Sequence, residues 1–154
     1  MSVSILNDSD GCIKWKEYMA ERINDSKRAY EIYMMITKPY CLMFCSWAAP
    51  FLSQSEFSEI LSDAWIRSEY VNNNGCLSCE QLTDMFKSSN PIYLMTNEEY
   101  NKYIKLDETV EIYRGVTSFN KDSIYALSWT LNQRTAEWFA SRFGENGTVF
   151  EAKI

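Results

Sequence analysis

Two short segments in the last third of the chain carry side chains that could bind a phosphate-bearing ligand. Arg114 and Gly115 follow the run 110–113, and Ser128 and Thr130 lie on either side of Trp129 in a second run. The planar guanidinium of Arg114 can reach phosphate, and Gly115 lets a ligand approach the backbone. Ser128 and Thr130 alternate along an extended chain, so their hydroxyls would share one face. These four residues predict one binding pocket.

Three strands and one helix are expected to position this pocket. The runs 110–113, 124–130 and 148–154 are short and rich in β-branched and aromatic residues, as strands are. Between the last two, the pattern predicts a helix that begins near Asn132, a good N-cap, and ends at Gly144 in a C′ position. The predicted buried residues of this helix are Ala136, Phe139, Ala140 and Phe143.

The first 106 residues are predicted to be mostly helical. The apolar run 40–49 indicates a buried helix that Pro50 interrupts. Capping boxes are indicated at three helix starts, by Ser53 with Glu56, Ser78 with Gln81, and Thr96 with Glu99. Two helical stripes precede them, Cys12, Trp15, Met19 and Ile23, then Ala29, Ile32, Tyr33 and Ile36.

These patterns together predict an α+β fold. We expect one domain over residues 1–154, in which a mostly helical portion, 1–106, packs on a small mixed or antiparallel sheet in 107–154. Helical spacing places four of the five tryptophans in the core, Trp15, Trp47, Trp65 and Trp138. Trp129 should also be core, because it points away from Ser128 and Thr130.

Composition narrows the classes of partner and compartment. A hydrophobic share of 46% indicates a globular protein, and a net charge of −6 argues against binding free nucleic acid. The first residues lack the pattern of a signal peptide, and the apolar run 40–52 is shorter than the roughly twenty residues of a membrane span. We therefore expect a cytoplasmic protein that does not bind a membrane.

The absence of histidine and the number of cysteines limit the chemistry further. A chain with no histidine cannot carry a Ser-His-Asp or Cys-His catalytic site or a histidine-ligated metal. Four of the five cysteines, Cys41, Cys45, Cys76 and Cys79, could supply thiolates to a zinc ion. The first pair lies in an apolar helical run, which favours ordinary buried thiols. We expect reduced thiols and no metal site.

The order of these motifs resembles the nicotinamide-binding half of ADP-ribosyltransferases of the Arg/Ser/Glu type. The segment 128–130, Ser-Trp-Thr, followed by the helical pattern 136–143, resembles phage and mobile-element members, as do the upstream stretches 63–69 and 94–99. Trp129 stands where the family has a central threonine. The lack of histidine excludes the His-Tyr-Glu subtype of the family.

The resemblance implies that NAD is bound as a substrate and assigns each residue a role. Arg114 would help to hold NAD and order the site, while main-chain atoms at Gly115 grip the nicotinamide amide. Ser128 would lie near the nicotinamide ribose, and Thr130 would brace the pocket.

The catalytic carboxylate is the main departure from the family pattern. Family members carry Glu-x-Glu or Gln-x-Glu after the third strand, and this chain has lysine two places after Glu151. Glu151 is the candidate substitute, with Arg114 and Ser128 as the other candidate catalytic residues, although an exposed strand glutamate is the simpler interpretation of Glu151. Glu145 fits a solvated turn, and Glu111 could form a cross-strand pair. Whether the protein is an enzyme is left open.

Three functional hypotheses follow. The first is a mono-ADP-ribosyltransferase that binds NAD and modifies a protein target. The second is a transferase scaffold that has lost catalysis and serves as a phage-encoded inhibitor of a host defence protein, for example a CRISPR nuclease. The third is a fragment of a longer transferase whose catalytic strands lie elsewhere.

Overall fold

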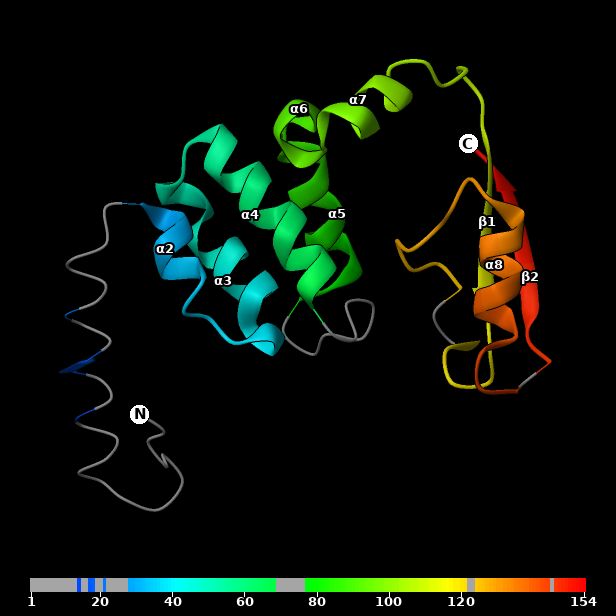
Figure 1. Ribbon diagram of the computed structural model, residues 1–154, viewed down its shortest axis with the longest axis horizontal. Coiled ribbons are helices and arrows are strands. Elements are labelled where there is room, and N and C mark those ends of the chain that lie inside the picture. Colours follow the sequence, from blue (N-terminus) through cyan, green and yellow to red (C-terminus); the bar gives the residue numbers. More distant parts are fainter. Residues whose placement is uncertain are drawn as a thin grey trace.

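The molecule has an α+β fold, as predicted. The computed structural model describes residues 14, 17–18, 21, 28–68, 77–121, 124–144 and 146–154. Within these, a group of helices is followed by a two-stranded antiparallel sheet with one helix against it (Figure 1). The stripe of Cys12, Trp15, Met19 and Ile23 lies outside the described residues, as do Cys76 and Glu145. No helix in the described ranges is long and apolar enough to span a bilayer.

Six α-helices whose bounds the structure describes precede the sheet, and the capping signals place three of them correctly. They are α2 (Ala29–Tyr33), α3 (Cys41–Ala48), α4 (Gln54–Arg67), α5 (Cys79–Ser88), α6 (Pro91–Leu94) and α7 (Asn97–Tyr103). Short 3-10 helices, η1 (Lys38–Tyr40) and η2 (Ala49–Phe51), flank α3. All three predicted capping boxes are present, at Ser53, Ser78 and Thr96.

The hydrophobic core lies among these helices. Its most buried residues are Tyr33, Cys41, Leu42, Cys45, Ile60, Leu61 and Ala64. Trp65 packs edge-on against Phe86, with ring centroids 5.2 Å apart. Leu127, from the segment before the last helix, also packs against this core. The helical portion therefore contacts the C-terminal portion through a loop residue.

The core prediction is wrong for two tryptophans. Trp47 is 71% exposed and Trp138 is 60% exposed. On α3, Cys41, Leu42 and Cys45 form the buried side, and Trp47 falls on the other. Trp15 lies outside the described residues, so its prediction remains open.

A buried tyrosine joins α2 to α4. The Tyr33 hydroxyl donates a hydrogen bond to Asp63 at 2.6 Å, and the Arg67 guanidinium lies 3.4 Å from the same carboxylate. Burial, with this hydrogen bond as the next cause, raises the pKa of Tyr33 well above 10. Asp63 begins the stretch 63–69, which was noted only for its resemblance to family members. In the structure it links α2 to α4.

The sheet consists of β1 (Glu111–Val116) and β2 (Thr148–Lys153), paired antiparallel from Glu111↔Lys153 to Val116↔Thr148. These are the first and third predicted strands. The first was expected to close at Arg114 and Gly115, and the ladder continues one residue further, to Val116.

The predicted strand 124–130 is wrong. This segment forms turns and makes one isolated bridge, in which Tyr113 and Thr130 exchange main-chain hydrogen bonds of 2.8 and 2.9 Å. Local bonds compete with the ladder, because the main-chain N–H of Trp129 donates to the Leu127 oxygen and its indole N–H donates to the Ala126 oxygen. Consequently Ser128 and Thr130 do not alternate along a strand.

The last helix, α8 (Gln133–Ala140), begins where the sequence predicted. The Asn132 side chain accepts hydrogen bonds from the main-chain N–H groups of Arg134 and Thr135. The predicted end at Gly144 is wrong, because α8 ends at Ala140 with Ser141 as its C-cap. A separate 3-10 turn, η5 (Arg142–Gly144), follows, and Gly144 in this turn has a left-handed φ of 74°. Phe143 also has a positive φ, 64°, which a bulky residue rarely adopts.

Only the small residues of α8 are buried. Ala136 and Ala140 face the sheet, whereas Phe139 is exposed and Phe143 is 77% exposed, contrary to prediction. The reason is the close approach of α8 to β1. A Cβ atom on Gly115 would lie 2.6 Å from the Ala140 nitrogen and 2.9 Å from the Phe139 Cβ, and closer still to the Ala136 oxygen.

This contact predicts unequal effects of two glycine substitutions. Gly115→Ala should lower the free energy of unfolding by about 1–3 kcal/mol or more, because helix backbone occupies the space that the methyl group needs. Gly144→Ala should cost only about 1 kcal/mol, because its surroundings are open and only its φ is unfavourable. Chemical denaturation measures both. A Gly115→Ala protein as stable as the Gly144→Ala protein would contradict the packing described.

Candidate functional site

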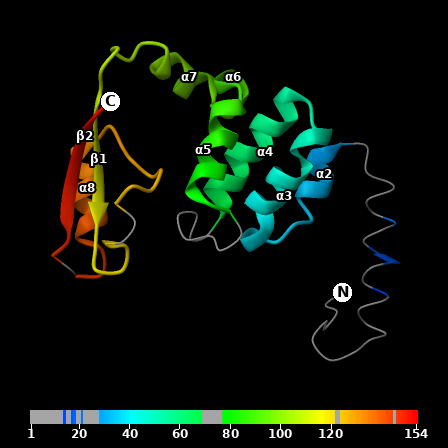
Figure 2. The ribbon, with the colours of Figure 1, turned by 180° about the vertical axis from the view of Figure 1, so that it is seen from behind.

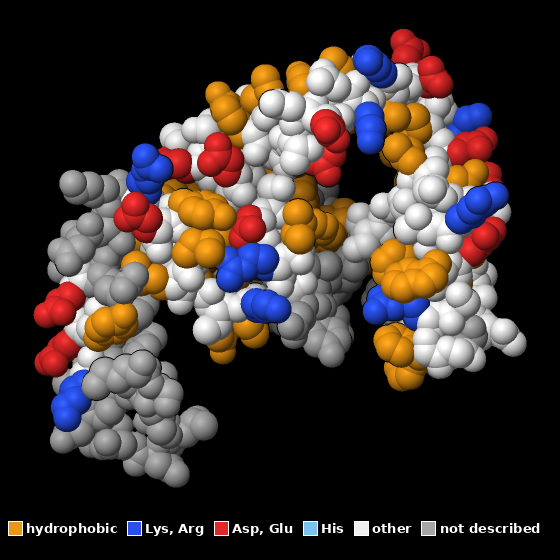
Figure 3. Space-filling model, viewed as in Figure 1, with side chains coloured by type: hydrophobic (Ala, Val, Ile, Leu, Met, Phe, Trp, Pro, Cys, Tyr) orange, Lys and Arg blue, Asp and Glu red, His pale blue; other side chains and the backbone are white. Residues whose placement is uncertain are grey.

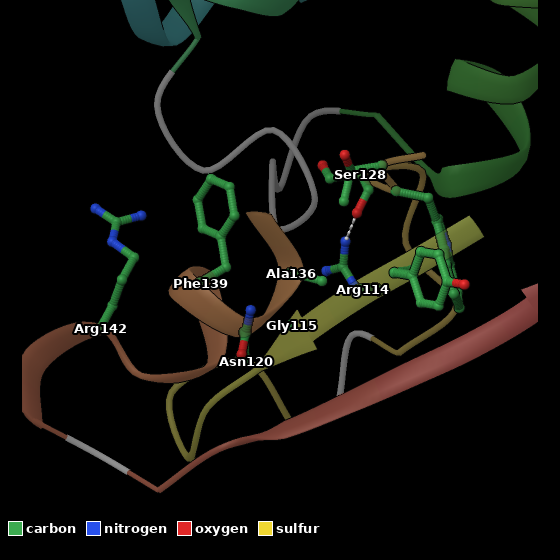
Figure 4. A pocket seen from close by; sticks show the side chains of 10 residues that line it. Arg114, Gly115, Asn120, Ser128, Ala136, Phe139 and Arg142 are labelled. Carbon is green, nitrogen blue, oxygen red and sulfur yellow. Dashed lines mark hydrogen bonds between the residues drawn. The ribbon is translucent and has the colours of Figure 1, made fainter. Parts of the chain in front are cut away.

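A cavity of about 310 Å³ lies between β1, the segment before α8, and α8 itself (Figure 4). All four residues predicted to form a pocket, Arg114, Gly115, Ser128 and Thr130, line it. The other lining residues are Tyr113, Asn120, Trp129, Ala136, Phe139 and Arg142. Two segments chosen for their side-chain chemistry therefore meet at one site.

Arg114 places a buried positive charge at this cavity. Its side chain is 5% exposed, and one guanidinium nitrogen donates to the main-chain oxygen of Ser128. Its Nε, also buried, has no hydrogen-bond partner among the described residues. Burial lowers the pKa of Arg114, but arginine stays protonated in proteins. The charge favours an anionic or oxygen-rich ligand, and the side chain also ties the loop 124–130 to β1.

Gly115 serves packing at this site. It lines the cavity, but the space beside its Cα is taken by the backbone of α8. Because Gly115 has no side chain, it is α8 that approaches β1 closely at this position.

The segment 128–130 contributes to the cavity in a way that strand alternation did not predict. Trp129 is half-buried and lines the cavity together with its two neighbours, so the expectation that it points away is wrong. The Thr130 hydroxyl oxygen accepts the Asn132 N–H at 3.1 Å. This bond fixes Thr130 at the start of α8 and leaves the hydroxyl hydrogen to donate.

Asn120 is a lining residue that sequence reasoning missed. Its side-chain oxygen accepts the Thr117 N–H at 2.7 Å, which closes a turn directly after β1. This orientation reserves the amide NH₂ for donation. The Thr-x-x-Asn spacing after a strand is the signal from which the turn, though not its place at the cavity, was predictable.

An exposed group of aromatic rings surrounds Arg142 at one side of the cavity. The guanidinium carbon lies 5.1 Å from the ring centres of Trp138 and Phe143 and 5.3 Å from that of Phe139. Phe119 packs edge-on against Phe143, with centroids 5.9 Å apart. We call these five residues the Arg142 cluster. All four rings are exposed. Figure 3 shows hydrophobic and basic side chains next to each other on the surface of the C-terminal portion.

The candidate catalytic carboxylate lies apart from these residues. Glu151 is exposed on β2 opposite Tyr113, and it is not among the residues that line the cavity. Glu111 lies opposite Lys153 in the ladder, and its carboxylate accepts a hydrogen bond from the Tyr113 hydroxyl on its own strand at 3.3 Å. Burial first, and then the charge of Glu111, raise the pKa of Tyr113. Among the described lining residues there is no aspartate or glutamate.

The described cysteines are ordinary thiols in position and bonding. Cys41 and Cys45 are buried in α3, and Cys45 donates to the main-chain oxygen of Phe57. Burial raises the pKa of Cys45 to about 12. Cys79 is exposed at the start of α5. No metal-binding group of three or more side chains occurs among the described residues.

Comparisons with protein-family models, curated proteins and solved structures gave no match to this chain.

The bond from Arg114 to Ser128 predicts how the cavity depends on this side chain. Arg114→Met should lower the free energy of unfolding by about 1–3 kcal/mol, because it removes the hydrogen bond that the buried guanidinium donates to the main-chain oxygen of Ser128. Amide hydrogens of residues 127–130 should exchange faster. Arg134→Met, on the exposed side of α8, is the matched control and should change stability by less than about 0.5 kcal/mol. Unchanged exchange at 127–130 in Arg114→Met would refute this role.

Proposed function

We propose that this protein is an ADP-ribosyltransferase-like protein that binds the nicotinamide end of NAD in the cavity and acts on a protein target. One observation carries the proposal. Arg114, Gly115, Ser128 and Thr130, which the family resemblance assigns to NAD, line a single cavity together with donors and aromatic rings.

The chemistry of the lining suits this end of the molecule. A volume of about 310 Å³ is at the low end of the roughly 300–1,000 Å³ of ligand pockets, so it suits nicotinamide and its ribose rather than the whole dinucleotide. The nicotinamide ring is cationic and prefers aromatic faces, which Trp129 and Phe139 supply. The phosphates are anionic and favour the guanidinium groups of Arg114 and Arg142.

Transfer requires more than binding. The bond between the nicotinamide nitrogen and the ribose carbon breaks, and the positive charge that develops at this carbon is stabilised by a carboxylate in such reactions. Among the described residues no carboxylate lines the cavity. Loss of one electrostatic stabiliser costs about 10²–10³ in rate. We therefore propose that binding of NAD is retained and that transfer to the target is slow.

The second candidate function is inhibition of a host protein by binding alone. The Arg142 cluster favours it, because tryptophan, phenylalanine and arginine exposed together are typical of protein-binding hot spots. The positive φ of Phe143 holds this ring outward at a conformational cost, as strained residues at binding sites often do.

NAD binding is tested with two neighbouring aromatic residues of α8. Isothermal titration with NAD should give a dissociation constant that rises about tenfold in Phe139→Ala and about fivefold in Ser128→Ala, because the lost contacts are worth about 1.4 and about 1 kcal/mol. Trp138→Ala, next to Phe139 but outside the cavity, is the control and should stay within about twofold. Equal effects of Phe139→Ala and Trp138→Ala, or no binding by the parent protein, would refute the proposal.

The inhibitor hypothesis predicts the opposite pattern for a target protein. A protein captured from host lysate without NAD should be lost with Trp138→Ala and retained with Ser128→Ala, because only the first removes an exposed ring of the Arg142 cluster. Intact-mass spectrometry of that partner, incubated with and without NAD, separates the two functions. A gain of one ADP-ribose unit supports the transferase, and an unchanged mass in a stable complex supports the inhibitor.

A further inference from the structure

Among the residues that the structure describes, no strand pairs with the outer edge of β2. The sheet has the order β1-β2, and Figures 1 and 2 both show β2 at the outside of the C-terminal portion. The register with β1 runs one residue to one residue without a bulge. The segment 148–154 also contains no proline. It therefore lacks two devices by which proteins commonly prevent a strand edge from pairing.

The direction of the main-chain groups at this edge follows from the ladder. Val110 and Ile154 exchange both hydrogen bonds, of 2.9 and 3.1 Å, so bonded pairs recur at every second residue along β2. The residues between them, Val149, Glu151 and Lys153, direct their N–H and C=O groups away from β1. The same rule points the groups of Tyr113 away from β2, where Thr130 does pair with them.

We propose that this edge pairs with the β2 edge of a second copy of the chain, antiparallel about Ala152. A four-stranded sheet, β1-β2-β2-β1, results. The inference is independent of whether the cavity binds NAD.

Charge selects the register. The main-chain groups that point outward belong to odd-numbered residues. An antiparallel self-pair must therefore set odd-numbered residues opposite odd-numbered residues. Centred on Ala152, the pair sets each Glu151 opposite Lys153 of the second copy, and each half-buried Phe150 opposite Ile154 of the second copy. Centring it on Glu151 or on Lys153 would set like charges face to face, which is unfavourable. Centring it on Phe150 would set Glu151 opposite Val149 and Lys153 opposite Gly147, so neither charge would face an opposite charge.

The pairing is sterically compatible with α8. This helix lies over β1 at Gly115, and the two copies of β1 would be three strand spacings apart, about 14 Å. Helices pack at about 8–10 Å, so the two copies of α8 fit on the same face. The addition also makes physical sense for the sheet, because two-stranded sheets are marginal alone and gain stability from further strands. A few paired residues bury little area, so the dimer should form on concentration.

The experiment uses two variants, each of which reverses one of the two charges, at Glu151 or at Lys153. Sedimentation equilibrium of the full chain should show a concentration-dependent dimer, and Glu151→Lys alone or Lys153→Glu alone should raise its dissociation constant about tenfold or more, because each creates two like-charge contacts. An equimolar mixture of the two variants should dimerise again, since both lysines of the first variant then face glutamates of the second. Lys105→Glu, an exposed charge between α7 and β1, should leave the dimer unchanged.

Two further outcomes decide the proposal. A parent protein that stays monomeric at its highest soluble concentration overturns it, as does a mixture that dimerises no better than the separate variants. Ala152→Cys places two thiols across the proposed axis, where facing Cα atoms lie about 4.5 Å apart and a disulfide can form. Oxidation should link this variant as a dimer but not Val149→Cys, and equal linking of both would refute the register.

Discussion

The contact between the backbone of α8 and that of β1 at Gly115 determines the shape of the C-terminal portion. Because Gly115 has no side chain, α8 descends onto the strand until Ala136 and Ala140 are buried. A helix that lies so close cannot bury its larger side chains beneath itself. Phe139 is displaced to the rim of the cavity, and Trp138 and Phe143 are left on the surface around Arg142. The cavity and the Arg142 cluster are thus two results of one packing contact.

The second constraint is the buried charge of Arg114. A buried guanidinium needs hydrogen-bond acceptors, and the main-chain oxygen of Ser128 is one that Arg114 has. This bond holds the loop 124–130 against β1 without a strand ladder, with the bridge from Tyr113 to Thr130 as the second attachment. The same guanidinium gives the cavity its preference for anions. A structural bond and a binding preference therefore share one side chain.

Signals that act within a few residues predicted much of the fold, and the errors occur where the outcome depends on contacts between distant segments. Capping boxes at Ser53, Ser78 and Thr96 act within one turn, so the sequence placed these helices correctly. The run 124–130 has strand composition, but a strand also needs a neighbour along its length, and the turn bonds of Trp129 are made instead. Burial of Trp47, Trp138 and Phe143 was predicted wrongly because helical spacing does not state which face the rest of the molecule covers.

The sequence by itself determined the α+β class, the starts of the capped helices, two strands in the runs 110–113 and 148–154, and the convergence of Arg114, Ser128 and Thr130 on one pocket. These depend on side-chain type and on spacing within short segments. Only the tertiary structure decided that Gly115 serves helix packing, that Asn120, Phe139 and Arg142 complete the cavity, and that Glu151 lies outside it. Those facts depend on which segments distant in sequence come within a few ångströms of each other, and no local pattern encodes that distance.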